Sequence, residues 1–131
     1  MGKVSESHNS YAIDAHIFEL RDQLYMVWSG NRRYSEIGQE TWIAPMANPW
    51  TLASDGVRIS QADQWWEGTI PLPGLGLQEG QEVIQVNDKV YLVYSTFGFT
   101  DDRYRMGMLS MNEEDDPLVP ASWTKFHGPV F

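Results

Sequence analysis

Two carboxylate side chains occupy comparable places in the two halves of this 131-residue chain. Asp14 and Glu79 each stand near the start of a stretch that has the pattern of a β-strand. Two carboxylates facing each other across a pocket can cleave a glycosidic bond, because one carboxyl donates its proton to the leaving oxygen while the charge of the other helps to raise the donor's pKa. The spacing alone equally allows two acidic residues that cap turns or face solvent.

Aromatic side chains are the second feature with chemical meaning. The chain has 6 Trp, 6 Tyr and 5 Phe residues, and aromatic rings stack well on the apolar faces of sugars. The candidate substrate-binding side chains are His16, Trp28, Tyr94, Phe97, Trp65 and Trp66. Each has a structural alternative: rings in strands can belong to the core, Trp65 and Trp66 can seal an edge between sheets, and His16 can be a structural histidine.

The elements that must position these residues are predicted to be strands throughout. Strands are expected over residues 12–18, 23–29, 41–46 and 56–60, and again over residues 81–86, 89–95, 104–111 and 122–126. No ten-residue window has helical periodicity, and residues 117–123, which contain two prolines, allow at most one turn. The predicted fold class is therefore all-β.

The two sets of strands resemble each other, which indicates an internal repeat. Leu24–Ser29 aligns with Val90–Ser95, and Trp50 and Trp123 each introduce a fourth strand. A repeat of four antiparallel strands is the blade of a β-propeller, in which the innermost strands line a central axis. One partial propeller domain over residues 1–131 follows, with blade-like units at about 11–67 and 79–131 and a linker between them over residues 68–78.

Two blades do not close a ring, so an isolated pair leaves sheet faces open. We therefore expect the propeller to be completed by self-association into a homo-oligomer. In such a ring the side chains of Asp14 and Glu79 converge on the axis.

Composition excludes several classes of function. The chain has no Cys, which removes disulfides and Cys-ligated metals, and its net charge of -9 argues against a nucleic-acid partner. No apolar run is long enough to span a membrane. The first ten residues lack the apolar core of a secretory signal, so a cytoplasmic location is expected for the chain as given. Neither a metal site nor a cofactor is expected.

Several motifs together resemble glycoside hydrolase family 43. They are the run from Ile43 to Leu52, the triplet Arg58-Ile59-Ser60 and the run from Asp116 to Phe131, and they follow one another in the family's order. The family consists of five-bladed propellers that act as α-L-arabinofuranosidases and β-xylosidases. The resemblance extends from about Tyr11 to Phe131 and implies that this chain holds about two of the blades.

The resemblance also implies roles for the two carboxylates. Glu79 stands in the position of the family's Glu-Gly-Pro motif and is expected to be the general acid, whereas Asp14 stands in its Ile-Asp motif and is expected to tune the pKa of that acid. The family inverts configuration with a third carboxylate as general base, which belongs to a blade before Asp14 and is absent from this chain. Gln81 replaces the motif's proline, which is expected to leave the acid's loop less rigid.

Two functions remain open from the sequence. The first is a family 43-like, arabinofuranosidase- or xylosidase-related protein that acts on or binds plant-type pentose glycans, by an inverting mechanism if it is active. The alternative is a non-catalytic carbohydrate-binding or structural propeller fragment that has lost the general base. Both make a carbohydrate the expected ligand.

Overall fold

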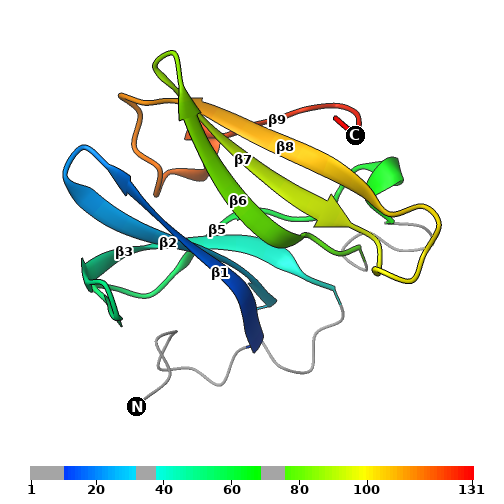
Figure 1. The fold of residues 1–131 in the computed structure, drawn as a ribbon, viewed down its shortest axis with the longest axis horizontal. Helices are drawn as coiled ribbons and strands as arrows, with labels where there is room; N and C mark the ends of the chain where they lie inside the picture. Colours follow the sequence, from blue (N-terminus) through cyan, green and yellow to red (C-terminus); the bar gives the residue numbers. More distant parts are fainter. Residues whose placement is uncertain (1–10, 32–37, 69–75) are drawn as a thin grey trace.

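Two antiparallel sheets, one from each half of the chain, pack against each other in the computed structural model (Figure 1), which describes residues 11–31, 38–68 and 76–131. The first sheet contains β1 (Tyr11–Leu20), β2 (Gln23–Asn31), β3 (Glu40–Asn48), β4 (Thr51–Leu52) and β5 (Val57–Ser60). The second contains β6 (Glu79–Val86), β7 (Lys89–Thr96), β8 (Arg105–Asn112) and β9 (Thr124–Lys125). Two short 3₁₀ turns, η1 (Trp65–Glu67) and η2 (Pro120–Ser122), complete the described elements.

The strand order follows the chain in both sheets, as in a blade. The second sheet runs β6-β7-β8-β9, and the first runs β1-β2-β3 with both β4 and β5 paired to β3. The predicted all-β class with two antiparallel meanders is confirmed, and the one turn expected within residues 117–123 is η2. Most of the predicted linker over residues 68–78 lies outside the described residues.

Both sheets begin with a tight two-residue hairpin. Arg21 and Asp22 join β1 to β2 with φ angles of 50° and 61°, and Asn87 and Asp88 join β6 to β7 with φ angles of 51° and 58°. Two successive residues with positive φ form the turn whose twist matches that of the strands, and Asn and Asp tolerate this conformation better than most residues. The two halves therefore share their local chemistry as well as their strand order.

A β-bulge at the same place in β1 and β6 defines the repeat more closely. In β1 the pairing moves from Ile13–Ser29 to His16–Val27, and in β6 it moves from Glu79–Ser95 to Glu82–Val93. Ile13 is thus the counterpart of Glu79, and Asp14 is the counterpart of Gly80. The two carboxylates lie one position apart within the same bulge.

The shared core shows how the sheets are oriented. Tyr25 and Val27 of β2 pack with Leu92 and Tyr94 of β7 in one buried cluster. In the repeat register Val27 corresponds to Val93, so the two sheets contribute opposite faces to the contact between them. They are stacked front to back, the arrangement by which successive propeller blades bury their faces.

The two halves differ most in their outer strands. Trp50 precedes the two-residue β4 and is 70% exposed, whereas Trp123 precedes β9, is 8% exposed and donates its indole N–H to the Pro117 carbonyl at 2.9 Å. The two tryptophans that look equivalent in sequence thus have different environments. The sequence predicts the four-residue strand β5 but not β4, which is an additional pairing at one end of β3.

Candidate active site

Asp14 and Glu79 lie at the same end of the two first strands, which contact each other (Figure 1). Asp14 has a φ of 53°, a conformation that Asp adopts more readily than most side chains. Its Oδ2 accepts a hydrogen bond from the Gly80 backbone N–H at 3.1 Å, across the boundary between the sheets. The bulge in each strand therefore brings the carboxylate of one sheet to the backbone that carries the carboxyl of the other.

The electrostatic environment of Glu79 favours its protonated form. Partial burial raises the pKa of Glu79 above its usual range, and the nearby negative charge of Asp14 raises it further. Both effects penalise the ionised carboxylate. A carboxyl group with a raised pKa retains its proton at a pH where ordinary glutamates have lost it, which is the requirement for a proton donor.

A buried side chain holds the segment that carries Glu79. Gln81 is 2% exposed, and its Nε2 donates to the Thr41 hydroxyl at 3.2 Å and to the Gln78 carbonyl at 3.0 Å. The sequence suggests a less rigid loop at this position because the proline is missing. Hydrogen bonds from the glutamine instead restrain the loop in the structure.

His16 also reaches the neighbouring sheet. Its Nδ1 lies 2.7 Å from Oε2 of Glu82, with 28% of the histidine side chain and 66% of the glutamate side chain exposed. His16 and Glu82 hold equivalent positions in the repeat, because each is the first paired residue after the bulge of its strand. Glu82 is a polar neighbour of the site that the sequence does not single out.

Three of the predicted substrate-binding rings are buried in the structure. Trp28 is 3% exposed and packs with Met26 and Met46, while Trp66 is 1% exposed. Tyr94 is fully buried, and its hydroxyl donates to Glu67 at 2.7 Å. Burial, and then the Glu67 carboxylate, hold the pKa of Tyr94 far above its usual range, so the phenol keeps the proton that it donates. These three rings therefore lie in the interior of the protein, as the structural alternative to substrate binding holds.

Two other predicted aromatic residues are accessible. Trp65 in η1 is 71% exposed, although its neighbour Trp66 is in the core. Phe97 follows β7 with a φ of 62° and lies partly exposed, with the guanidinium carbon of Arg103 4.6 Å from its ring centroid. Because Ser95 pairs with Glu79, Phe97 lies at the same end of the second sheet as the candidate acid.

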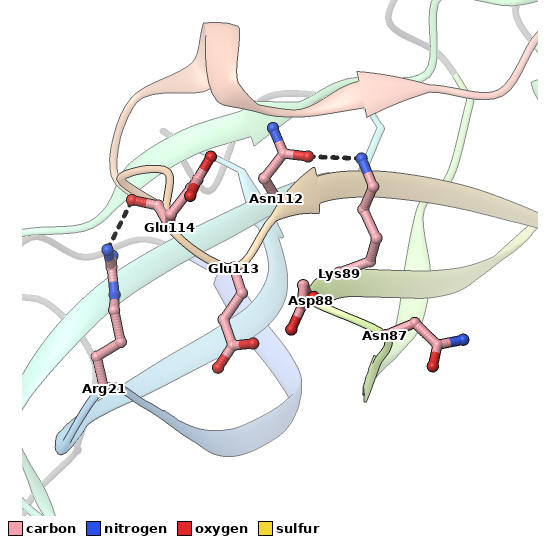
Figure 2. Close-up of a pocket in the computed structure, with 7 residues that line it drawn as sticks. All are labelled: Arg21, Asn87, Asp88, Lys89, Asn112, Glu113 and Glu114. Atoms are coloured by element: carbon pink, nitrogen blue, oxygen red, sulfur yellow. Dashed lines mark hydrogen bonds between the residues drawn. The ribbon is translucent and has the colours of Figure 1, made fainter.

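A hollow lies at the opposite end of the sheets, away from the two carboxylates. It has a volume of about 510 Å³ and is bordered by both hairpin turns and the end of β8 (Figure 2). Figure 2 shows Arg21 directed at the Glu114 carbonyl, to which it donates at 2.7 Å, and Lys89 directed at Asn112 at 2.6 Å. Arg21 also donates to the Asp115 carbonyl at 2.8 Å. The two hydrogen bonds of Arg21 fasten the first hairpin to the turn that follows β8.

Neither a metal-binding cluster nor a membrane-spanning helix is found in residues 11–31, 38–68 and 76–131. No group of three or more His, Cys, Asp or Glu side chains there could hold a metal ion. No helix in those ranges is long and apolar enough to cross a membrane.

Comparison with known proteins places these features in a family. Over 130 residues the chain is 36% identical to an extracellular exo-α-(1→5)-L-arabinofuranosidase of Streptomyces avermitilis, covering 99% of this chain and 26% of that protein. It is 34% identical to α-L-arabinofuranosidase 43 of Humicola insolens, again covering 99% of this chain and 26% of the relative. The chain thus spans about a quarter of the length of these two curated relatives.

Solved structures agree with this assignment. The crystal structure of an α-L-arabinofuranosidase from Lactobacillus brevis superposes with a TM-score of 0.87 at 36% identity, over 98% of this chain and 38% of that one. A thermostable family-43 glycoside hydrolase superposes with a TM-score of 0.72 at 28% identity, over 89% of this chain and 37% of that one. The fold is therefore a partial propeller of this kind, made of two blades. The sequence profile of the glycosyl hydrolases family 43 matches residues 1–131, and the chain belongs to that family.

Proposed function

We propose that this chain carries the acid half of an arabinofuranosidase-like pocket, with Glu79 as general acid and Asp14 as the carboxylate that raises its pKa. The observation that carries the proposal is the contact between the blades, in which Asp14 accepts the Gly80 N–H beside a carboxyl group whose pKa is raised. Protonated Glu79 donates to the glycosidic oxygen as the bond to the sugar breaks. Asp14 fixes the backbone next to the acid through its hydrogen bond with the Gly80 N–H.

The proposed substrate is a pentose glycan with terminal α-L-arabinofuranosyl groups. The curated relatives are arabinofuranosidases by name, which supports this sugar over others. Phe97 and Trp65 offer partly or largely exposed rings for stacking on the sugar, and His16 offers a partly exposed polar side chain in contact with Glu82. Trp28, Tyr94 and Trp66 are assigned to the core instead of the binding surface because they are buried.

An inverting mechanism needs a second carboxylate to activate water, about 6.5–9.5 Å from the acid. The family resemblance assigns this base to a blade before Asp14. Since the chain covers about a quarter of its curated relatives, turnover requires that carboxylate from elsewhere. The alternative function is a module that binds the glycan, or only supports the fold, without turnover.

The face of the second blade that points away from the first supports a role for a second copy of the chain. Tyr91 and Val93 correspond to Tyr25 and Val27, which form the contact between the blades, and Ile84 beside them is 51% exposed. We propose that a second copy covers this face. Light scattering should then give a dimer or larger ring that Val93→Lys dissociates, whereas Asp22→Asn, in the exposed turn between β1 and β2, has no effect; a monodisperse monomer contradicts this proposal.

The acid role is tested with an aryl α-L-arabinofuranoside and with calorimetry of arabino-oligosaccharide binding. Turnover should fall by at least 10²-fold in Glu79→Gln, roughly the contribution of a positioned acid. Glu113→Gln, at the opposite end of the sheets, should leave turnover unchanged. Binding without turnover, weakened by Trp65→Ala, identifies the binding module, and absence of both overturns the proposal.

The cytoplasmic location expected from the sequence stays a prediction, and the Streptomyces relative is extracellular by name.

A further inference from the structure

Glu79 is flanked by two buried glutamines. Gln78 is fully buried and Gln81 is 2% exposed, although glutamine is a side chain that normally lies at the surface. Both point into the boundary between the blades, where Thr41 of β3 contacts each of them. The backbone that presents the candidate acid is therefore held from both sides by polar side chains that water does not reach.

Gln78 uses all its hydrogen-bonding groups. Its Nε2 donates to the Ser60 hydroxyl at 3.0 Å and to Glu67 Oε1 at 2.8 Å, and its Oε1 accepts from the Thr41 hydroxyl at 3.0 Å. Its backbone carbonyl accepts from the Ser29 hydroxyl at 2.8 Å and from Gln81 Nε2 at 3.0 Å. The first blade thus fixes the residue immediately before Glu79.

The side chain of Gln81 differs because only its Nε2 has hydrogen-bond partners. Its Oε1 is buried and has no hydrogen-bond partner within the described ranges. A buried acceptor without a donor costs about 1–3 kcal/mol relative to its hydrated state. Stability by itself therefore does not explain a glutamine here, because an apolar side chain of the same length would fill the space without that penalty.

We propose that Gln81 is a positioning residue that holds the Glu79-Gly80 bulge through Thr41 and the Gln78 carbonyl. By anchoring the bulge to β3 it keeps the Gly80 N–H directed at Asp14 and keeps Glu79 partly buried. The hydrogen bonds of Gln81 restrain the bulge, as the ring of a proline would restrain the backbone at this position. This inference rests on the proposed acid role of Glu79 for its catalytic meaning, and on the contacts alone for its structural content.

The test is an NMR titration of the Glu79 side-chain carboxyl together with the amide shift of Gly80. Gln81→Met keeps the length of the side chain and removes both the Nε2 bonds and the unpaired oxygen. The pKa of Glu79 should fall back toward that of an ordinary glutamate, and the Gly80 amide should move upfield as its bond to Asp14 weakens. The melting temperature should change little, because the lost hydrogen bonds and the removed penalty offset each other.

Gln85→Met is the matched control. Gln85 lies on the same strand and also bridges the blades, since its Nε2 donates to the Glu19 carbonyl at 2.9 Å, but it is remote from the bulge. This variant should leave the pKa of Glu79 and the Gly80 shift as in the unmodified chain. An equal effect of both variants, or no effect of Gln81→Met, overturns the positioning role.

A second pair of variants covers the case in which Gln81→Met does not fold. Thr41→Val removes the hydroxyl that accepts from Gln81 and donates to Gln78, whereas Thr41→Ser keeps both hydrogen bonds. The valine variant should reproduce the two NMR changes and the serine variant should not, and identical spectra for both contradict the inference. If Glu79 titrates normally in the unmodified chain, the acid role fails, while the Gly80 shift still reports whether Gln81 positions the bulge.

Discussion

Asp14 and Gly80 occupy the same position of the same bulge in successive blades, and the side chain of the first accepts a hydrogen bond from the backbone of the second. Glu79 precedes Gly80, so its carboxyl lies next to the peptide unit that Asp14 holds. Both bulge residues have positive φ, 53° for Asp14 and 64° for Gly80. The pairing of the two carboxyl groups thus depends on a local backbone feature that the repeat contains twice.

The charge of Asp14 should be required for the raised pKa of Glu79. Asp14→Asn keeps a side chain that tolerates positive φ but removes the negative charge, so the pKa of Glu79 should fall. Asp22→Asn is the matched control, because Asp22 has a φ of 61° in the hairpin turn at the other end of β1. A carboxyl NMR titration checks both variants, and an unchanged titration in Asp14→Asn contradicts the proposed coupling.

The same pKa shift predicts a pH-dependent effect on stability. A pKa that is higher in the folded state means that the ionised form of Glu79 opposes folding. This penalty is absent below the pKa of the unfolded chain and is complete above the raised pKa. Glu79→Gln should therefore raise the melting temperature at pH 7, by roughly 1–4 °C, and should give no gain below pH 4. A gain of the same size at both pH values would mean that its origin is not ionisation.

The buried ion pair between the blades should contribute far more to the free energy of unfolding than an exposed lysine does. Glu67 is fully buried and accepts from Lys125 Nζ at 3.0 Å, and the lysine side chain is only 14% exposed. Lys125→Met leaves the carboxylate without its countercharge and should cost about 3 kcal/mol in urea unfolding. Lys89→Met, at an exposed site, should change the free energy of unfolding by less than about 0.5 kcal/mol. Equal losses in both variants contradict the structural role of the pair.

Gly107 should not accept a side chain. A Cβ atom there would lie 2.4 Å from the Tyr94 ring, which is itself fully buried and hydrogen bonded to Glu67. Gly107→Ala should therefore lower stability by about 1–3 kcal/mol, the usual cost of overpacking. Gly98→Ala meets no atom within 4 Å and serves as the control. Thermal melts of the two variants should separate them clearly.

The fold was predictable because its signals are local. Alternating apolar residues and the two-residue turns at Arg21-Asp22 and Asn87-Asp88 indicate every strand except β4, and their order, without any long-range information. The family motifs indicated Asp14 and Glu79 as candidates. Their one-residue offset was not predictable in detail, because a bulge is defined by the pairing of two strands, and neither strand alone shows it.

The buried polar residues around the site could not be predicted for a different physical reason. Gln78, Gln81 and Glu67 look like surface residues in the sequence, and only the packing of the second blade on the first removes them from water. Tyr94 is buried at the same boundary, whereas Trp28 is buried against other side chains of the first sheet. Strand alternation alone cannot decide which face of a blade is covered, because tertiary structure determines burial.

Arg21 gives the boundary between the blades a mechanical property. At one end of the sheets Asp14 holds the Gly80 amide, and at the other end the Arg21 guanidinium donates to two carbonyls in the turn that follows β8. Two blades that were held together at a single point could rotate against each other, whereas hydrogen bonds at both ends of the boundary oppose that rotation. A change in the angle between the blades would therefore have to break hydrogen bonds at one end of the boundary or the other.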